Sequence, residues 1–364
     1  MKRLFLLFVL PVLPVFFFYS CHQPTSDKDM RVRQLVDTVG FAQYDWQMDS
    51  LFARIERYRG DSLARWTNKD FSWRMCISPH DDYTYAGWLY PAVLSHVKAP
   101  VVLMFGVAHK ARLLNLQDKI VTGTYPAWKG IYGNIRVSPL RNEIFNRLDS
   151  SLYVVNDSMI TIEHSLEALL PFLQYYNRRI EIIPVLVPYM DYYRMDEISR
   201  KFADALRAVM ESHHLTWGKD LAIVISTDAV HYGDEDWGGK NYAVYGTDSA
   251  GTADARKHEF EIIKNCLTGP VLQTKAKLFT QYTVRDDDYK IYKWTWCGRY
   301  SVPFGLLTGF HLQQALEAPP LGGILIGYAS SIDHTPIPVD DIRMGITAPA
   351  NNHHWVGYTA VGYK

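Results

Sequence analysis

Two histidines of this chain each follow a short apolar run. His80 ends the segment CISPH, and His109 ends the segment VVLMFGVAH. The end of a buried strand that leads into a loop is where layered α/β proteins place their chemistry. The pattern therefore predicts that the two imidazole rings reach one site.

Three other segments carry side chains that could complete such a site. Asp228 and His231 lie in AIVISTDAVHYG, and Cys297 lies in WTWCGRYSVPFG. Glu163 and His164 lie in TIEHSLEALLPFL, at the predicted start of a helix, where free backbone N–H groups favour anions. Imidazole and thiolate are donors that suit zinc, copper or Fe(II), and a further histidine could transfer a proton near neutral pH.

The residue types alone leave other interpretations open, because none of these spacings is a local metal motif such as HExxH or CxxC. Each strand-end histidine could cap backbone groups. Cys297 lies among tryptophans and could be a buried, inert thiol. Asp228 and His231 could bond to each other in a loop, and the Glu-His pair could cap its helix.

Alternating strand and helix patterns surround these segments. The predicted strands, several of them continuous runs typical of strands buried on both faces, are Arg74–Ser78, Val101–Val107, Lys119–Thr122, Ile180–Val187, Leu221–Thr227, Gly323–Tyr328 and Trp355–Gly362. The predicted helices are Gly87–His96, Leu140–Asp149, Ser165–Tyr176, Met195–His213, Ala255–Leu267, Leu272–Gln281 and Val302–Ala315. This alternation predicts one layered α/β domain, with a mixed β-sheet sandwiched by helices.

The first residues form a different kind of segment. Residues 1–20 combine two early cations, an apolar run and a final serine, which predicts a signal peptide. The layout resembles a bacterial lipoprotein signal, which implies lipidation of Cys21; plain secretion or an uncleaved anchor are the alternatives. Residues 21–30 would then be a polar tether and residues 31–364 the domain. We expect a chain that is lipid-anchored to a bacterial membrane in the cell envelope, facing the periplasm or the surface.

The composition describes a globular protein with ample core. Of the 364 residues 48% are hydrophobic and 21% are charged, with 38 basic and 38 acidic residues. Formal neutrality gives no electrostatic support for a nucleic-acid partner. Beyond Cys21 the chain has Cys76, Cys266 and Cys297, so at least one thiol lies outside any intramolecular disulfide.

Six blocks in a fixed order resemble the Memo family, in particular the bacterial group named AmmeMemoRadiSam system protein B. They read SPHDDYTYAG, VVLMFGVAH, EHSLEALLPFL, IEIIPVLV, IVISTDAVHYG and WCGR. Memo proteins are similar in fold to the LigB-type class III extradiol dioxygenases, so the resemblance implies a LigB-dioxygenase-like α/β domain. Family members usually read PHAGY where this chain has Asp81 and Asp82, which we interpret as solvated or capping residues.

The resemblance also implies roles for single residues. His80 and His109 correspond to two metal ligands, and Cys297 stands where the dioxygenases have a glutamate. A sulfur donor favours copper over Fe(II), so the expected metal is copper or iron, with zinc as a further option. His231 falls where the dioxygenases keep their acid/base histidine. Asp228 and His164 would line the cavity, with Asp228 holding the tautomer of His231.

Two functions follow from this resemblance. The first is metal-dependent redox or dioxygenase-type chemistry on a small molecule. The alternative is a non-catalytic protein on a dioxygenase-like scaffold that binds a small molecule, a peptide or copper. The only membrane contact we expect is the lipid on Cys21.

Overall fold

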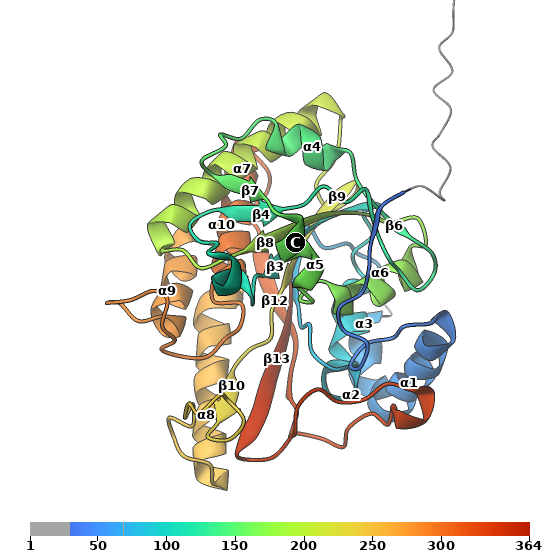
Figure 1. Cartoon of the computed structure of the whole chain (residues 1–364), viewed down its shortest axis with the longest axis vertical. Coiled ribbons are helices and arrows are strands. Elements are labelled where there is room, and N and C mark those ends of the chain that lie inside the picture. Colours follow the sequence, from blue (N-terminus) through green and yellow to red (C-terminus); the bar gives the residue numbers. More distant parts are fainter. Residues whose placement is uncertain (1–29, 68) are drawn as a thin grey trace, which may run out of the picture. The chain divides into compact units, whose positions relative to one another are not determined.

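A mixed β-sheet forms the centre of the computed structural model, which describes residues 30–67 and 69–364 (Figure 1). The strands follow the order β1-β5-β6-β8-β3-β9-β2-β13-β12-β11. The central four, which run parallel, are β8 (Glu181–Val187), β3 (Val101–Val107), β9 (Leu221–Ser226) and β2 (Met75–Ser78). The sheet continues with two antiparallel strands, β13 (His354–Tyr363) and β12 (Gly322–Ser330).

Short strands extend the sheet and its edges. They are β1 (Val32–Arg33), β4 (Ile120–Thr122), β5 (Ala127–Trp128), β6 (Ile135–Val137), β7 (Tyr153–Val155), β10 (His231–Gly233) and β11 (Gly269–Pro270). Of these, β10 pairs antiparallel with β13, with His231 opposite Val356. This pairing carries the segment that follows β9 toward the β13 side of the sheet.

The central strands are apolar on both faces because helices cover both. Along β2, Met75 and Ile77 pack into one core cluster, whereas Cys76 packs into the other. Along β3, Phe105 belongs to the first cluster and Met104 to the second. Since successive side chains of a strand point to opposite faces, a strand between two apolar layers must be apolar at every position.

Each helical layer contributes to one of the two core clusters. The first layer contains α4 (Leu140–Phe145), α7 (Tyr192–Ser212), α8 (Ser249–Ile262), α9 (Gln273–Thr283) and α10 (Ser301–Ala315). The second contains α1 (Asp45–Thr67), α2 (Tyr83–Ala86), α3 (Leu89–Leu94), α5 (Asp157–Ile162) and α6 (Leu170–Tyr176). Figure 1 shows α7, α9 and α10 on one side of the sheet and α1, α3 and α6 on the other. The predicted fold class, a mixed sheet sandwiched by helices, is confirmed.

Two local predictions are wrong. The helix predicted from Ser165 begins as a 3₁₀ turn at Glu167–Leu169 and becomes α-helical only in α6. Glu163 therefore lies at the C-terminal end of α5, in extended conformation, and not at the start of a helix. The predicted helices also omit Asp45–Thr67, where the structure has α1, a helical segment with a kink at Arg59.

Arg31–Lys364 form one compact unit. The predicted signal peptide and Cys21 lie outside the described residues, so they stay predictions, as does the tether over residues 21–30. Cys76, Cys266 and Cys297 are all buried and free. Among the helices of the described residues, none has the length and apolar character needed to span a bilayer.

Candidate metal centre

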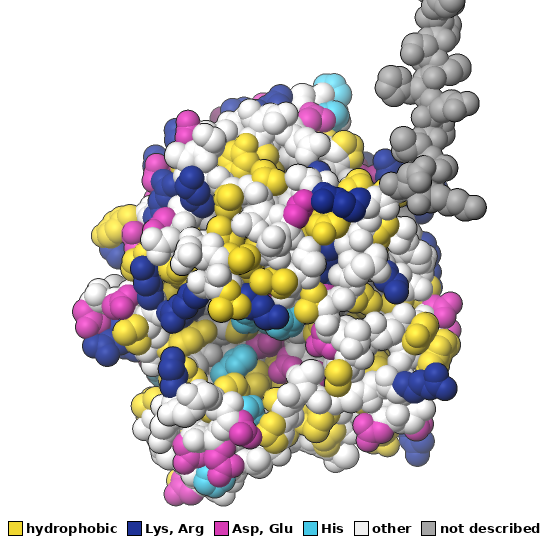
Figure 2. Space-filling model, viewed as in Figure 1, with side chains coloured by type: hydrophobic (Ala, Val, Ile, Leu, Met, Phe, Trp, Pro, Cys, Tyr) yellow, Lys and Arg dark blue, Asp and Glu magenta, His cyan; other side chains and the backbone are white. Residues whose placement is uncertain are grey.

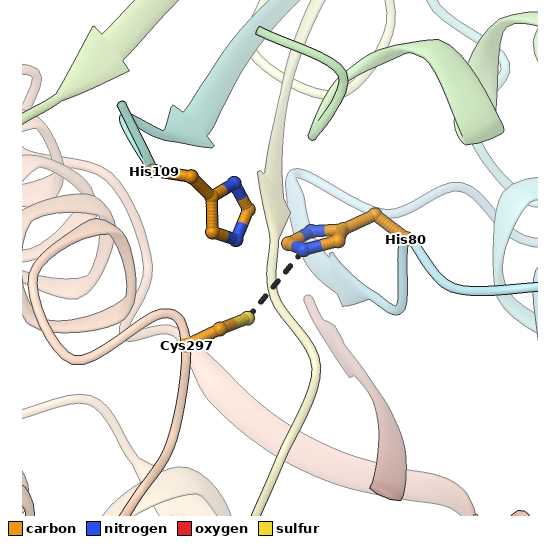
Figure 3. A group of neighbouring side chains, drawn as sticks. All are labelled: His80, His109 and Cys297. Atoms are coloured by element: carbon orange, nitrogen blue, oxygen red, sulfur yellow. Dashed lines mark hydrogen bonds between the residues drawn. The ribbon is translucent and has the colours of Figure 1, made fainter. Parts of the chain in front are cut away.

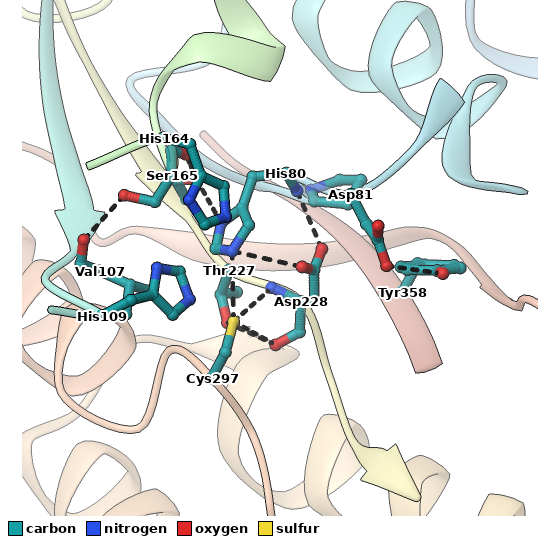
Figure 4. Close-up of polar contacts among 12 residues, drawn as sticks. His80, Asp81, Val107, His109, His164, Ser165, Thr227, Asp228, Cys297 and Tyr358 are labelled. Carbon is teal, nitrogen blue, oxygen red and sulfur yellow. Dashed lines mark hydrogen bonds and ion pairs between the residues drawn. The ribbon is translucent and has the colours of Figure 1, made fainter. Parts of the chain in front are cut away.

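Three neighbouring parallel strands end at the candidate site. The order β3-β9-β2 places β9 between the other two, and all three point the same way. His109 follows β3, Asp228 follows β9, and His80 follows β2, each two residues after its strand. Because the carboxyl ends of parallel strands share one edge of the sheet, residues far apart in sequence meet there (Figure 4).

His80, His109 and Cys297 come together as the sequence predicts. The Cys297 Sγ lies 3.5 Å from Nε2 of His80. One donor atom from each of the three side chains lies within 4.8 Å of the other two, and Figure 3 shows all three side chains turned toward a common point. A tetrahedral metal with nitrogen and sulfur ligands holds those atoms roughly 3.5 Å apart. The donor set and its spacing therefore fit a transition metal.

The tautomer of His80 follows from its hydrogen bonds. Its Nδ1 lies 2.8 Å from Oγ of Ser226. The Ser226 hydroxyl donates its own hydrogen to the carbonyl oxygen of Ser165, so it must accept from Nδ1–H of His80. The proton therefore resides on Nδ1, and the Nε2 lone pair faces the sulfur. Burial, followed by the neighbouring histidines, lowers the pKa of His80 well below its ordinary value, so the ring is neutral at pH 7.

Glu163 orients His109 in the same way. Its carboxylate accepts one hydrogen bond from Nδ1–H of His109 at 2.8 Å and another from the backbone N–H of His109 at 2.7 Å. It also accepts the backbone N–H groups of His164 and Ser165 at 3.0 and 2.9 Å. Although burial opposes ionisation, the adjacent His109 lowers the pKa of Glu163 to about 2. The ionised carboxylate thus holds the proton on Nδ1 and leaves Nε2 of His109 free to bind a metal.

Cys297 reaches the site from the loop before α10. The backbone of Gly298 packs so closely on Thr227 that a Cβ at this position would lie 2.0 Å from Thr227 Oγ1. The backbone N–H of Asp228 donates to Cys297 Sγ at 3.0 Å. Burial, followed by the nearby Asp228, raises the pKa of the Cys297 thiol well above its ordinary value. A bound cation would supply the positive charge that stabilises the thiolate there.

Asp228 is part of the site and holds the backbone of His80. Its Oδ1 accepts the backbone N–H of His80 at 2.9 Å, and its Oδ2 lies 3.2 Å from His80 Nε2. Within residues 30–67 and 69–364 it makes no hydrogen bond to His231. The donor atoms of the two lie within 4.8 Å of each other, so the predicted role of Asp228 toward His231 stays a prediction that no direct hydrogen bond supports. The pairing of β10 with β13 fixes His231 separately, while the carboxyl group faces the end of β2.

His231 and His164 line the space beside the three donors. A donor atom of His231 lies within 4.8 Å of Cys297, and its buried Nε2 has no partner among the described residues. Burial lowers the pKa of His231 to about 3, so the ring is neutral at pH 7. His164 stacks on His109, with ring centroids 4.9 Å apart and planes 7° from parallel. Burial lowers the pKa of His164 to about 4.

A cavity of about 150 Å³ opens in front of these residues. We call it the acidic cavity, because its lining combines four histidines with four aspartates: His80, His109, His164, His231, Asp37, Asp81, Asp82 and Asp228. Figure 2 shows it as a hollow in which histidine and acidic side chains gather.

The interpretation of Asp82 as a solvated residue is wrong, whereas its place as N-cap residue of α2 agrees with a capping residue. Asp82 is only 1% exposed, and its Oδ2 accepts the backbone N–H of Thr347 at 2.6 Å. Asp81 accepts the Tyr358 hydroxyl at 2.8 Å. Burial, followed by the adjacent Asp81, raises the pKa of Asp82 to about 8. The two carboxyl groups are fixed parts of the cavity wall.

Sequence reasoning missed the residues that fix the imidazole tautomers. Ser226 lies two residues before Asp228 in a block that was singled out, yet no local pattern marks a serine as the partner of a distant histidine. Glu163 was singled out, but as a residue of a helix start. Its pairing with His109 leaves no local pattern, since 54 positions separate the two.

Comparison with known proteins identifies the family. A family model described as Memo-like protein matches residues 38–315. The chain belongs to the Memo family. A MEMO1 family protein of Thermotoga neapolitana is 31% identical to this Memo chain over 269 residues, which cover 70% of the chain and 81% of the relative.

Shorter matches connect this Memo chain to other relatives. A MEMO1 family protein of Aquifex aeolicus is 31% identical over 159 residues, and one of Pyrococcus horikoshii is 29% identical over 166 residues. Each match covers 43% of the chain, and it spans only about half of the relative's length, 53% and 52%. These likenesses support the family assignment, and the activity is a separate question.

Proposed function

We propose that this Memo chain binds one transition metal through His80, His109 and Cys297 and performs redox chemistry on a small molecule in the acidic cavity. The observation that carries the proposal is the pair of fixed tautomers. Both histidines have Nδ1 occupied by an oxygen partner, so both carry the lone pair on Nε2. Nε2 of His80 lies 3.5 Å from the sulfur and 3.2 Å from Oδ2 of Asp228, which a bound metal would displace from the ring nitrogen. A metal bound there would polarise a substrate oxygen or exchange electrons with the substrate.

The donor types favour copper or iron, with zinc as a further option. Two neutral imidazoles suit all three ions, whereas the Cys297 sulfur favours the more thiophilic copper. Cys297 is 5% exposed, so the sulfur is shielded from bulk solvent. The proposal therefore ranks copper first.

His231 is the residue that we propose as proton acceptor. It is neutral at pH 7 because burial lowers its pKa to about 3, and its Nε2 has no partner among the described residues. Its unpartnered nitrogen beside the metal donors is placed to take a proton from a substrate hydroxyl whose own pKa a bound metal would lower. His164 supports the site through its stacking on His109, and Asp228 supports it by holding the backbone of His80.

The alternative is a metal site without turnover, either for copper handling or for binding a ligand or peptide. The sulfur donor favours this alternative, because a thiolate beside an Fe(II) centre that meets O₂ tends to be oxidised. The two functions differ only in whether a substrate reacts. Metal binding through the same three side chains is common to both.

Elemental analysis of the chain, purified without chelator or affinity metal, tests the shared part. We expect one equivalent of metal in the wild-type chain. In titrations with Cu(I), Fe(II) and Zn(II), the variants His80→Ala, His109→Ala and Cys297→Ser should no longer bind that equivalent. The control is His213→Ala, since His213 forms a surface pair with Glu143 far from the site. Unchanged binding in the three ligand variants would contradict the proposal.

Assays with catechols under O₂ separate the two functions. Ring cleavage by the metal-loaded chain, lost in His231→Ala while metal binding persists, supports the enzyme. Metal binding without any turnover of the catechols supports the non-catalytic alternative.

A further inference from the structure

A second cavity lies on the other side of the metal donors. It has a volume of about 90 Å³ and is lined by His109 and Cys297, by two arginines, Arg112 and Arg299, and by the aromatic rings of Tyr189, Tyr292 and Tyr300. We call it the arginine cavity. His109 lines both cavities, so the donor group stands between them.

The two arginines are placed by the same segments that place the metal donors. Arg112 lies in the 3₁₀ helix Ala111–Leu114, three residues after His109. Arg299 follows two residues after Cys297. Both guanidinium groups donate through Nη2 to the carbonyl oxygen of Lys290, at 2.7 Å from Arg112 and 3.2 Å from Arg299. One carbonyl therefore brings two positive charges close together.

No carboxylate neutralises these charges. Within the described part of the chain, neither Arg112 nor Arg299 forms an ion pair. Arg299 is only 7% exposed, and its buried Nη1 has no hydrogen-bond partner there. A buried cation without a counter-charge is costly, and an anion between the two groups would offset that cost.

Aromatic rings hold the buried guanidinium in place. The Arg299 Cζ lies 3.5 Å from the ring centroid of Tyr292 and 4.9 Å from that of Tyr300. This stacking fixes the plane of the guanidinium before any ligand arrives. A planar guanidinium with a fixed orientation is suited to two oxygens of a carboxylate or phosphate.

We propose that the arginine cavity binds the anionic group, a carboxylate or a phosphate, of a small molecule whose other end reaches His109 and Cys297. This molecule is then an anionic co-substrate or ligand of the same donor group, which it approaches from the arginine cavity and not from the acidic cavity. Only the placement of its reacting end rests on the proposed function. The anion site itself depends on Arg112 and Arg299 and not on a metal.

Calorimetric titration of the metal-free full chain with inorganic phosphate and, separately, with acetate tests the anion site. We expect saturable binding of at least one anion to the wild-type chain. Binding should weaken about tenfold or more in Arg299→Gln, because a hydrogen bond between charged groups is lost. Preference for phosphate indicates a phosphate ester as the natural ligand, and preference for acetate indicates a carboxylate.

Two further variants keep the test decisive. Arg112→Gln changes an exposed residue and should weaken binding even if Arg299→Gln does not fold. Arg285→Gln is the matched control, because Arg285 is a surface arginine paired with Asp287 at 2.8 Å, and it should bind as the wild type does. Wild-type affinity in both Arg112→Gln and a folded Arg299→Gln, or no binding of either anion to the wild type, would overturn the proposal.

Metal titration of the same variants separates this proposal from the metal site. Arg112→Gln should keep its metal equivalent while it loses anion affinity. If instead the ligand variants keep their metal and Arg112→Gln loses the anion, the metal assignment fails and the anion site stands. If the ligand variants lose the metal and Arg112→Gln binds anions normally, the anion site fails and the metal site stands.

Discussion

The sulfur of Cys297 lies 3.5 Å from Nε2 of His80, although 217 positions separate the two residues along the chain. Two features of the fold produce this contact. The parallel register of β2 and β9 places His80 beside the segment that follows β9. The close packing of Gly298 on Thr227 then brings the loop of Cys297 against that same segment.

Gly298→Ala should disturb this contact. The added Cβ would lie 2.0 Å from Oγ1 and 2.4 Å from Cβ of Thr227, and neither atom is the end of a long flexible chain. We expect a loss of about 1–3 kcal/mol in the free energy of unfolding, typical of overpacking, together with weaker metal binding. Urea unfolding and metal titration measure the two effects. Gly322→Ala is the control, since its nearest atom is 4.0 Å away; equal behaviour of the two variants would contradict the packing argument.

Glu163→Gln should weaken metal binding without removing any donor. The carboxylate of Glu163 accepts Nδ1–H of His109, and an amide cannot provide the same charge to four N–H donors. Loss of such a partner typically costs 10–100-fold in metal affinity, and we expect a value of about that size. Competitive titration against a chelator measures it. Glu143→Gln removes a surface glutamate that pairs with His213 at 2.8 Å, and it should have no effect.

A buried carboxyl group connects two segments of the site. Glu259 on α8 is fully buried and accepts the indole N–H groups of Trp294 and Trp296 at 2.5 and 2.6 Å. It also accepts the backbone N–H of Val230 at 3.1 Å. These partners flank His231 and Cys297 in the sequence. Burial raises the pKa of Glu259 to about 7, even though the three donors oppose this shift.

The raised pKa of Glu259 predicts a pH-dependent stability. Between about pH 4.5 and 7 the carboxyl group ionises in the unfolded chain but stays protonated in the folded one, so stability falls as the pH rises through that window. Glu259→Gln does not titrate. The free energy of unfolding of the wild type relative to this variant should therefore fall by about 3 kcal/mol across the window. Urea unfolding at a series of pH values measures the difference.

Glu261→Gln provides the control for this pH series. Glu261 lies on the same helix with a side chain 55% exposed. Its variant should follow the wild-type pH dependence. A constant difference between the wild type and Glu259→Gln at all pH values would show that Glu259 stays ionised in the folded chain.

The sequence predicts the strands and donors of this Memo chain well, because both depend on strong local patterns. Continuous apolar runs such as Val101–Val107 leave few options other than a buried strand, and His80 and His109 follow such runs directly. The helix α1 escapes prediction because its buried positions Met48, Leu51 and Ile55 are followed by a charged stretch and a kink at Arg59.

Contacts between distant segments are what the sequence does not reveal. Asp82 looks like a loop residue, yet Thr347 covers it from the far end of the chain. Asp228 and His231 are three residues apart and their donor atoms lie within 4.8 Å of each other, yet Asp228 bonds to the backbone of His80 instead of to His231. Such relationships depend on strand order, and the local pattern carries no information about it.

Ser226→Ala tests whether the tautomer of His80 matters. The Ser226 hydroxyl accepts a hydrogen bond from Nδ1–H of His80 and donates one to the Ser165 carbonyl oxygen. The variant therefore leaves a buried N–H without a partner. The proton is then free to move to Nε2, where it blocks the metal. We expect about tenfold weaker metal binding or more, and nitrogen NMR of the metal-free chain should show a larger share of the Nε2–H tautomer. Ser199→Ala removes another fully buried serine, on α7, whose hydroxyl donates to the Asp196 carbonyl oxygen, and it should leave both measurements unchanged. A wild-type affinity in Ser226→Ala would mean that the position of His80 alone, without its fixed proton, is sufficient for the site.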